Sequence, residues 1–269
     1  MIKVNGLASN VLPVTDRGLA YGDGVWETIV IREHQLKQLD KHLARLQKGL
    51  TALAIKNLDL SLVRDECHKL ESKNENAIVK LIITRGDAQR GYAYDDTNPC
   101  RWILSTHELP VFPGSYEEEG VSLFQCDTRL AINPRLAGFK HLNRLEQVLA
   151  RAEFTAEYQE GLVCDYDDHV IEGTMSNVFV ITEDNRIVTP DLSSSGIAGV
   201  ARSCIIEHCH DLGQPVEVKP LVLHDMNNAK GLFLSNSVIK IWPVKQYQNK
   251  HFAIPAIIRT LQGQVNKSL

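Results

Sequence analysis

The sequence of 269 residues lacks the features of a membrane, secreted or nucleic-acid-binding protein. Its apolar runs stay shorter than the roughly 18 residues of a spanning helix, and the first ten residues, MIKVNGLASN, lack the layout of a signal peptide. Neither sign of charge is in large excess, because the chain has 29 Lys and Arg and 33 Asp and Glu, which gives a net charge of -4. We therefore expect no nucleic acid and no membrane as partner, and a cytoplasmic protein that acts on small molecules.

Paired cysteines are also missing, since no CxxC spacing occurs and the six cysteines are scattered through apolar stretches. This pattern excludes a secreted disulfide framework and a zinc knuckle, and it predicts reduced, buried thiols. Cys204, His208 and His210 are close in sequence, but a soft-ligand site needs four converging ligands. An ordinary helix explains these residues, and we expect no metal.

Hydrophobic residues make up 43% of the chain, enough for a sizeable core. Their periodicity predicts an α+β fold, with strands grouped before and after a pair of helices in the first half. The segment 25–31 (VWETIVI) is rich in the β-branched and aromatic residues of strands, and Asp40 is placed to cap a helix. In this half we expect strands at 25–31, 35–39, 77–84 and 102–106, and helices at 40–53 and 59–71.

A stretch near residue 115 breaks all periodicity, because it combines Pro110, Pro113 and Gly114 with the acidic run 117–119. We expect two domains, joined there by a linker. Their bounds are 1–112 for a small N-terminal α/β domain, 113–120 for the linker and 121–269 for a larger C-terminal domain that carries Lys140.

The second half is predicted to combine antiparallel strands with three helices. The longest helix, 142–158, places Leu142, Leu145, Leu149 and Ala152 on one face, which we expect to face the core. The other elements are strands at 121–126, 162–166, 169–172, 177–182, 186–189, 231–234 and 239–244, and helices beginning near Gly199 and after Pro255.

Lys140 and Arg45 are candidates for chemistry, although each has an ordinary explanation. Lys140 follows Gly138 and Phe139 at a loop-to-helix junction, where a desolvated amine acquires the lowered pKa that a Schiff-base lysine requires. An isolated lysine is usually a surface residue. Arg45 lies on an apolar helix (HLARL), where it either extends to solvent, the favoured interpretation, or binds an anion at the edge of the core.

Two further segments fit a phosphorylated, ring-containing ligand. Residues 196–202 (GIAGVAR) form a glycine-punctuated turn that runs into a helix, and the N–H groups of such a turn can bind phosphate. A bare helix start explains them equally well. Glu172 ends a strand before Gly173, where a buried carboxylate can meet a cationic ring nitrogen, although a turn-exposed acid is commoner.

The order of these segments resembles the fold-type IV pyridoxal-phosphate enzymes, the group of branched-chain aminotransferases, D-amino acid aminotransferases and aminodeoxychorismate lyases. The resemblance runs from residue 16 to residue 244 and so covers nearly the whole chain. The matching segments are DRGLAYGDGVWETI (16–29), HLARL (42–46), GFKHLNRLEQVLAR (138–151), VIEGTMSNVFV (170–180), SGIAGVAR (195–202) and SNSVIKIWPV (235–244).

Within this group, KHLNRLEQVLAR resembles the aminodeoxychorismate lyases more than the aminotransferases. TRGDAQRGY (84–92) also resembles the substrate-side loop of these lyases. Trp26 and Glu27 after GDGV are at least as close to the aminotransferase motif, which keeps an aminotransferase for branched-chain or D-amino acids as an alternative. A catalytically silent relative that only binds a ligand is a further alternative, against which the intact Lys140 and Glu172 argue.

The resemblance implies pyridoxal 5'-phosphate as cofactor and assigns a role to each candidate. Lys140 bonds covalently to the cofactor and later moves protons, and Glu172 keeps the pyridine nitrogen protonated. The phosphate is bound by Arg45, by the N–H groups of Val200 and Ala201, and by the hydroxyl of Ser237. The group's architecture places the cofactor between two domains of a homodimer.

The substrate that the resemblance implies, 4-amino-4-deoxychorismate, carries two carboxylates, for which arginine is the natural partner. Arg90, with its neighbour Tyr92, is the candidate to bind them, and Trp26 is a candidate wall of the pocket. The products are pyruvate and 4-aminobenzoate, a folate precursor. Asn143 and Arg144 either orient the reacting groups or point to solvent or to a subunit contact.

Overall fold

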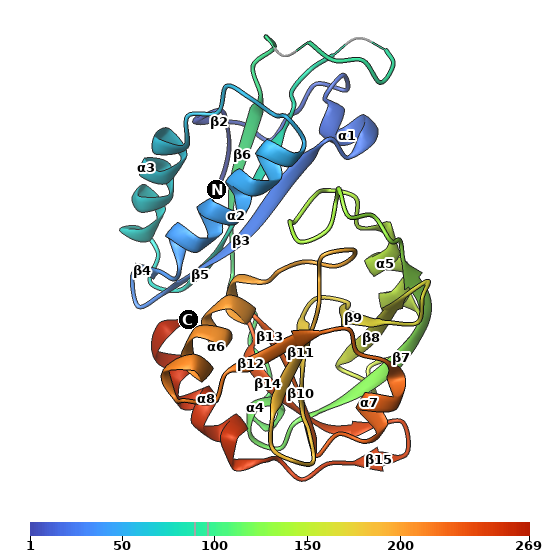
Figure 1. Ribbon diagram of the computed structural model, residues 1–269. Helices are drawn as coiled ribbons and strands as arrows, with labels where there is room; N and C mark the ends of the chain where they lie inside the picture. The colour runs from blue at the N-terminus through green and yellow to red at the C-terminus, as the bar shows by residue number, and fades with distance from the viewer. Residues whose placement is uncertain (89, 96) are drawn as a thin grey trace. The chain divides into compact units, whose positions relative to one another are not determined.

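The computed structural model describes residues 1–88, 90–95 and 97–269, which form two compact units (Figure 1). Unit 1 comprises Met1–Pro110 and Phe139–Asn143, and unit 2 comprises Val111–Gly138 and Arg144–Leu269. Each unit combines helices with its own sheet, so the predicted α+β class is confirmed. Throughout the described residues, each helix is too short or too polar to cross a membrane.

Unit 1 contains a six-stranded sheet in the order β2-β1-β6-β5-β3-β4, in which every neighbouring pair is antiparallel. Three helices accompany it, and Figure 1 shows α2 lying along the sheet. The strands are β1 (Ile2–Val4), β2 (Leu7–Ala8), β3 (Gly24–Arg32), β4 (Gln35–Leu36), β5 (Ala77–Thr84) and β6 (Arg101–His107), and the helices are α1 (Arg17–Tyr21), α2 (Leu39–Ala52) and α3 (Leu60–Glu71).

Strand β3 follows the alternation expected of a sheet with one covered face. Val25, Ile29 and Ile31 are buried, whereas Trp26 and Thr28 between them are half-buried, because successive side chains point to opposite faces. The covered face packs against α2, whose leucines at 43, 46 and 50 form the predicted apolar stripe.

The start of α2 differs from the sequence-based expectation. A strand was expected through residue 39, but β4 ends at Leu36 and the helix begins at Leu39. Gln38 is the reason, because its φ of 54° lies in the left-handed region and turns the chain out of the strand. Asp40 therefore lies in the first turn of the helix rather than at its cap.

Unit 2 is built on a nine-stranded mixed sheet in the order β12-β11-β10-β13-β14-β7-β8-β9, with β15 paired to β14. Its strands are β7 (Val121–Leu130), β8 (Glu160–Asp165), β9 (Val170–Gly173), β10 (Asn177–Ile181), β11 (Ile187–Pro190), β12 (Val216–Lys219), β13 (Gly231–Asn236), β14 (Lys240–Tyr247) and β15 (Lys250–His251). Its helices are α4 (Ser115–Glu118), α5 (Leu145–Ala152), α6 (Val200–Asp211), α7 (Leu223–Asn227) and α8 (Ala256–Ser268).

The central strands of unit 2 are buried on both faces. Val178 and Val180 of β10 face one core cluster, while Phe179 and Ile181 face a second cluster that includes α6 and α8. Phe179 stacks on Phe233 of β13 with ring centroids 4.6 Å apart. Burial on both faces explains why these strands are continuous apolar runs without polar alternation.

The segment expected to be a linker belongs to unit 2, and the units divide at Pro110 and Val111. Helix α4 forms within residues 113–120, and Tyr116 packs edge-on against Trp242 at 5.2 Å. Arg259 of α8 donates a hydrogen bond of 2.8 Å to the carbonyl of Glu117. These contacts fold the segment onto α8 and β14 instead of leaving it extended.

Two other expectations about this region also differ from the structure. The lysine segment, expected in the C-terminal domain, groups with unit 1, because Leu142 donates its N–H to the carbonyl of Gly24 at 3.0 Å. The helix expected at 142–158 is therefore confined to 145–152. Leu145 and Leu149, expected in the core, are 75% and 60% exposed, and α5 buries Ala150 instead.

Two glycines are expected to respond to alanine substitution with opposite signs. A Cβ at Gly161 in β8 would lie 2.5 Å from both Cys126 Sγ and Phe154 Cε1, so Gly161→Ala should lower the free energy of unfolding by about 1–3 kcal/mol. Gly263 lies on the exposed side of α8 with open space around it, so Gly263→Ala should raise that free energy by about 0.5–1 kcal/mol. Urea denaturation followed by circular dichroism measures both changes, and equal effects would contradict the packing of Gly161.

Candidate active site

Lys140 is held against β3 by backbone hydrogen bonds. The N–H of Trp26 donates to the carbonyl of Lys140 at 2.9 Å, and Trp26 Nε1 donates to the carbonyl of His141 at 3.2 Å. Val25 and His141 form an antiparallel bridge. The five-residue segment 139–143 therefore lies along the start of the strand, and its lysine is fixed by the same backbone that carries Trp26.

The ammonium group of Lys140 lies over the ring of Trp26, 4.0 Å from its centroid. A second cation, Lys80 of β5, lies 5.1 Å from the same centroid. Cations over an indole face are attracted by its quadrupole, so Trp26 favours this position of the lysine. Lys140 is half-buried.

Arg45 does not extend to solvent, as the favoured interpretation expected, but forms a two-point ion pair with Glu27. Its Nε donates to Glu27 Oε1 at 2.7 Å and its Nη2 to Oε2 at 2.5 Å. His42, one helical turn earlier, has its Nδ1 2.6 Å from Glu27 Oε2. Glu27 lies on the covered face of β3 with no exposed surface, so the carboxylate is neutralised where it would otherwise be costly.

The charges in this cluster shift two pKa values. Burial opposes ionisation of Glu27, but the Arg45 charge and the hydrogen bonds from His42 and Arg45 outweigh it and lower the pKa to about 2. Burial also lowers the pKa of His42, although Glu27 acts in the opposite direction, and the charges of Arg45 and Lys140 lower it further. Lys140, His42 and Arg45 are thus electrostatically coupled within unit 1.

Glu172 lies in β9 of unit 2, one residue before the end of the strand, and is 4% exposed. Its Oε2 accepts a hydrogen bond of 2.8 Å from the N–H of Ile197, in the turn before α6. Burial lowers the pKa of Arg144, and the negative charge of Glu172 partly offsets this effect. The carboxylate is buried and oriented, as the binding of a cationic ring nitrogen requires.

The start of α6 has the form of an anion site. Gly199 is the N-cap and supplies no side-chain hydrogen bond, so the N–H groups of Val200 and Ala201 begin the helix without a capping side chain. Asn177 holds the preceding turn, because its side chain donates to the carbonyl of Ile197 at 2.8 Å and accepts from the N–H of Gly199 at 3.1 Å. A Cβ at Gly199 would lie 2.1 Å from Asn177 Oδ1, so this position needs glycine.

Two serines lie at the end of β13: Ser235 within the strand and Ser237 just beyond it. Ser235 of β13 pairs with Asn177 in register, and its fully buried hydroxyl has no hydrogen-bond partner among the described residues. Ser237 follows in the turn after β13, which Asn236 closes by accepting from the N–H groups of Val238 and Ile239. An unsatisfied buried hydroxyl beside an uncapped helix start fits the phosphate of the expected cofactor.

The predicted substrate residues Arg90 and Tyr92 lie in an exposed segment of unit 1. Tyr92 is 85% exposed, and its carbonyl accepts a hydrogen bond of 3.2 Å from Arg17. Asn143 donates to the carbonyl of Gly22 at 3.2 Å, so its side chain orients backbone in unit 1.

The structure divides the predicted residues between the two units. Lys140, Arg45, Trp26, Arg90 and Tyr92 belong to unit 1, and Glu172, Val200, Ala201 and Ser237 to unit 2.

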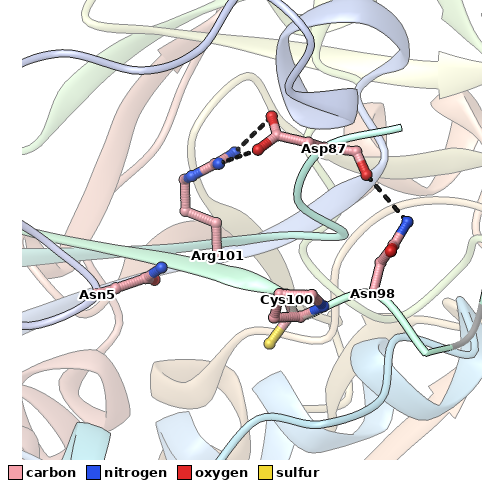
Figure 2. Close-up of a pocket in the computed structure, with 6 residues that line it drawn as sticks. Asn5, Asp87, Asn98, Cys100 and Arg101 are labelled. Atoms are coloured by element: carbon pink, nitrogen blue, oxygen red, sulfur yellow. Dashed lines mark hydrogen bonds and ion pairs between the residues drawn. The ribbon is translucent and has the colours of Figure 1, made fainter. Parts of the chain in front are cut away.

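A small cavity of about 120 Å³ in unit 1 contains none of the predicted residues (Figure 2). It is lined by Asn5, Asp87, Asn98, Pro99, Cys100 and Arg101. Figure 2 shows Arg101 pointing at the carboxylate of Asp87, which it binds at 2.6 Å, and Asn98 donating to the Asp87 carbonyl at 3.3 Å. These contacts hold together the two ends of the segment that carries Arg90, with Asp87 before it and Asn98 and Arg101 after it.

Three residues of the site escaped the sequence-based analysis. Glu27 and His42 fix Arg45, and Asn177 fixes the turn before α6. A signal for Glu27 was present, because it occupies a buried position of β3 between Val25 and Ile29, where an acid needs a cationic partner. No comparable signal distinguishes Asn177 from an ordinary strand residue.

This chain is similar to two aminodeoxychorismate lyases along its whole length. A curated aminodeoxychorismate lyase from Vibrio harveyi is 37% identical over 271 residues, which cover 99% of this chain and all of the relative. The crystal structure of 4-amino-4-deoxychorismate lyase from Pseudomonas aeruginosa is 40% identical, with a TM-score of 0.96 and coverage of 100% and 99% of the two chains.

A more distant structure shares the fold alone. It is a hypothetical aminotransferase from Mycobacterium tuberculosis in its PLP-bound form, 19% identical over 97% of this chain and 94% of its own, with a TM-score of 0.83. The predicted fold-type IV architecture is thereby confirmed, and enzymes of this fold family depend on pyridoxal phosphate. Residues 24–247 match the model of the class IV aminotransferases, and the chain belongs to this family.

Proposed function

We propose that this chain is a pyridoxal-phosphate-dependent lyase that converts 4-amino-4-deoxychorismate to 4-aminobenzoate and pyruvate. The observation that carries the proposal is the likeness to the Pseudomonas aeruginosa lyase, at 40% identity and a TM-score of 0.96 over the whole chain. The segment KHLNRLEQVLAR, which begins at the candidate lysine, supports the same choice within the family.

The proposed cofactor is bound by the candidate residues that the resemblance assigns to it. Lys140 attaches it covalently, and Glu172 holds a proton on its ring nitrogen. Its phosphate accepts hydrogen bonds from Arg45, from the N–H groups of Val200 and Ala201, and from the hydroxyl of Ser237. An arginine fork, a helix N-terminus and a hydroxyl are each suited to a dianion, and together they fix its orientation.

When bound, pyridoxal phosphate supplies an electron-accepting ring next to the substrate carbon that carries the amino group. Lys140 Nζ takes the proton from that carbon, C4 of the substrate ring. The bond between C3 and the ether oxygen then breaks, and the enolpyruvyl group leaves with a proton as pyruvate. The remaining ring becomes aromatic, which drives the reaction, and 4-aminobenzoate is released without any further reactant.

The substrate carboxylates are assigned to Arg90, with Tyr92 beside it, and Trp26 is assigned to the wall of the pocket. The cation–π contact supports the assignment of Trp26, because its ring lies within 4.0 Å of the ammonium that must act on the substrate. The exposure of the segment that carries Arg90 supports its access to an anionic ligand.

A class IV aminotransferase for branched-chain or D-amino acids is the alternative, favoured by Trp26 and Glu27 after GDGV. Both reactions use the same cofactor residues, so the alternative differs in the fate of the proton. An aminotransferase returns it to the cofactor and releases a keto acid, whereas the lyase releases pyruvate from the substrate itself.

Product analysis separates the two reactions. Purified protein loaded with pyridoxal phosphate and given aminodeoxychorismate alone should release equal amounts of pyruvate and 4-aminobenzoate, measured by chromatography. A requirement for an added keto acid, with turnover of amino acids only, would identify an aminotransferase. A protein that stays colourless with pyridoxal phosphate would indicate a silent relative.

Replacement of the lysine should remove colour and activity together. Lys140→Ala is expected to lose the visible absorbance band of the lysine-bound cofactor and all lyase turnover, because no other amine is assigned to both tasks. Lys80→Ala is the matched control, since Lys80 also lies over the Trp26 ring, at 5.1 Å. Survival of the visible band in Lys140→Ala would contradict the assignment of Lys140. Loss of the band in Lys80→Ala would show that the assay responds to general damage of the fold rather than to the lysine that binds the cofactor.

Loss of the Arg45 guanidinium should weaken cofactor binding more than turnover of the loaded enzyme. For Arg45→Ala we expect a loss of about 1.5–3 kcal/mol in the binding free energy of pyridoxal phosphate, the range for hydrogen bonds to charged groups. Titration of the visible band measures it, and Arg45→Lys keeps a cation beside Glu27 should the alanine variant fail to fold. Arg64→Ala, which removes an arginine paired with Asp40 at 2.6 Å, should bind the cofactor normally. Unchanged affinity in both Arg45 variants would exclude Arg45 from the phosphate site.

A further inference from the structure

The motif DRGLAYGDG at 16–24 contains an arginine that the proposed chemistry does not use. Arg17 is 4% exposed and lies at the start of α1. Its guanidinium donates to three consecutive carbonyls of the segment 90–95: Nη1 to Gly91 at 3.0 Å and to Ala93 at 3.3 Å, and Nη2 to Tyr92 at 3.2 Å. A single buried side chain thus binds the backbone of an exposed segment.

A carboxylate at the other end of the motif fixes this guanidinium. Arg17 Nε donates to Asp23 Oδ2 at 2.8 Å, and Arg85 Nε donates to the same oxygen at 2.7 Å. Arg85 in turn donates to the carbonyls of Leu53 and Ala54 at 2.6 and 3.0 Å, at the end of α2. Asp23 therefore links the arginine that binds the segment to one anchored on a helix.

Two tyrosine rings, those of Tyr21 and Tyr94, pack on these two arginines. The guanidinium carbon of Arg85 lies 3.7 Å from the ring centroid of Tyr94, and that of Arg17 lies 4.9 Å from the centroid of Tyr21. Tyr21 also contacts Tyr92, with centroids 5.5 Å apart, and its hydroxyl accepts from the N–H of Gly91 at 3.3 Å. The segment is thus bound through its carbonyls, one N–H group and two of its side chains.

We propose that Arg17, held by Asp23, is a positioning residue for substrate recognition: it fixes the backbone of residues 91–93 and thereby presents Arg90 and Tyr92 to an anionic substrate. The inference rests on the proposed function, which assigns those two residues to the substrate carboxylates. It gives a function to the contact between Arg17 and Asp23, two residues that the proposed reaction does not otherwise use.

The geometry requires arginine rather than lysine at this position. The planar guanidinium directs Nε to Asp23 and its two Nη atoms to the carbonyls of Gly91, Tyr92 and Ala93. A lysine ammonium is a compact charge and cannot reach these four acceptors at once. Arg17→Lys should therefore resemble Arg17→Met in substrate binding, although it keeps the positive charge.

The segment provides its own structural probe, because trypsin cleaves after the exposed Arg90. In Arg17→Met and Arg17→Lys we expect cleavage after Arg90, identified by mass spectrometry, to be about tenfold faster than in wild type, as for the loss of one charge-assisted hydrogen bond. The KM for aminodeoxychorismate should rise by a similar factor, while the affinity for pyridoxal phosphate, titrated by its visible band, stays unchanged. Tyr21→Phe, which removes only the hydroxyl bound to the Gly91 N–H, should show a smaller change in the same direction.

Arg64→Met is the matched control, because it removes an arginine–carboxylate pair of unit 1 that does not contact residues 90–95. It should match wild type in cleavage and KM. A folded Arg17→Met that trypsin cleaves after Arg90 at the wild-type rate would overturn the inference. If the Arg17 variants do not fold, the same comparison of cleavage rates in Asp23→Asn and Tyr21→Phe decides it. Faster cleavage with an unchanged KM for aminodeoxychorismate would also overturn the inference. In that case the proposed function would still stand, provided that the wild type shows lyase turnover. A wild type without lyase turnover would contradict the proposed function itself.

Discussion

The pairing of the segment 139–143 with the start of β3 is the constraint on which the candidate site of unit 1 depends. The hydrogen bond from the Trp26 N–H to the Lys140 carbonyl fixes the lysine backbone, and the indole ring of the same tryptophan lies under its ammonium. One strand residue thus sets both the path of the chain and the position of the candidate lysine's amine. The strand's next residue, Glu27, points to the opposite face and there orients Arg45.

Buried carboxylates organise each part of the site by binding cations or N–H groups. Glu27 is kept ionised by Arg45 and His42, Asp23 joins Arg17 to Arg85, and Glu172 accepts from the N–H of Ile197. Such pairs contribute little net stability, because the cost of desolvating both charges offsets their attraction. Such a pair also acts on orientation, since a bidentate contact, as between Glu27 and Arg45, fixes the plane of the guanidinium.

Prediction from the sequence succeeded where the signal is local. The strand at 77–84 and the helix capped by Asp59 are confirmed, because alternation and capping act within a few residues. It failed at Leu142, Leu145 and Leu149, whose helical spacing is real but whose environment is not set by spacing. Pairing of Leu142 with Gly24, more than a hundred residues away, shortens the helix and turns its leucines outward.

The sequence by itself determined the family, the α+β class and the identity of the candidate lysine, because ordered motifs and periodic patterns are properties of the chain. Only the tertiary structure decided the partner of Arg45, the unit to which Lys140 belongs and the contacts of Arg17. These depend on which strands lie side by side and on which charges share a buried space. Both are set by packing between segments far apart in the chain, where residue spacing carries no information.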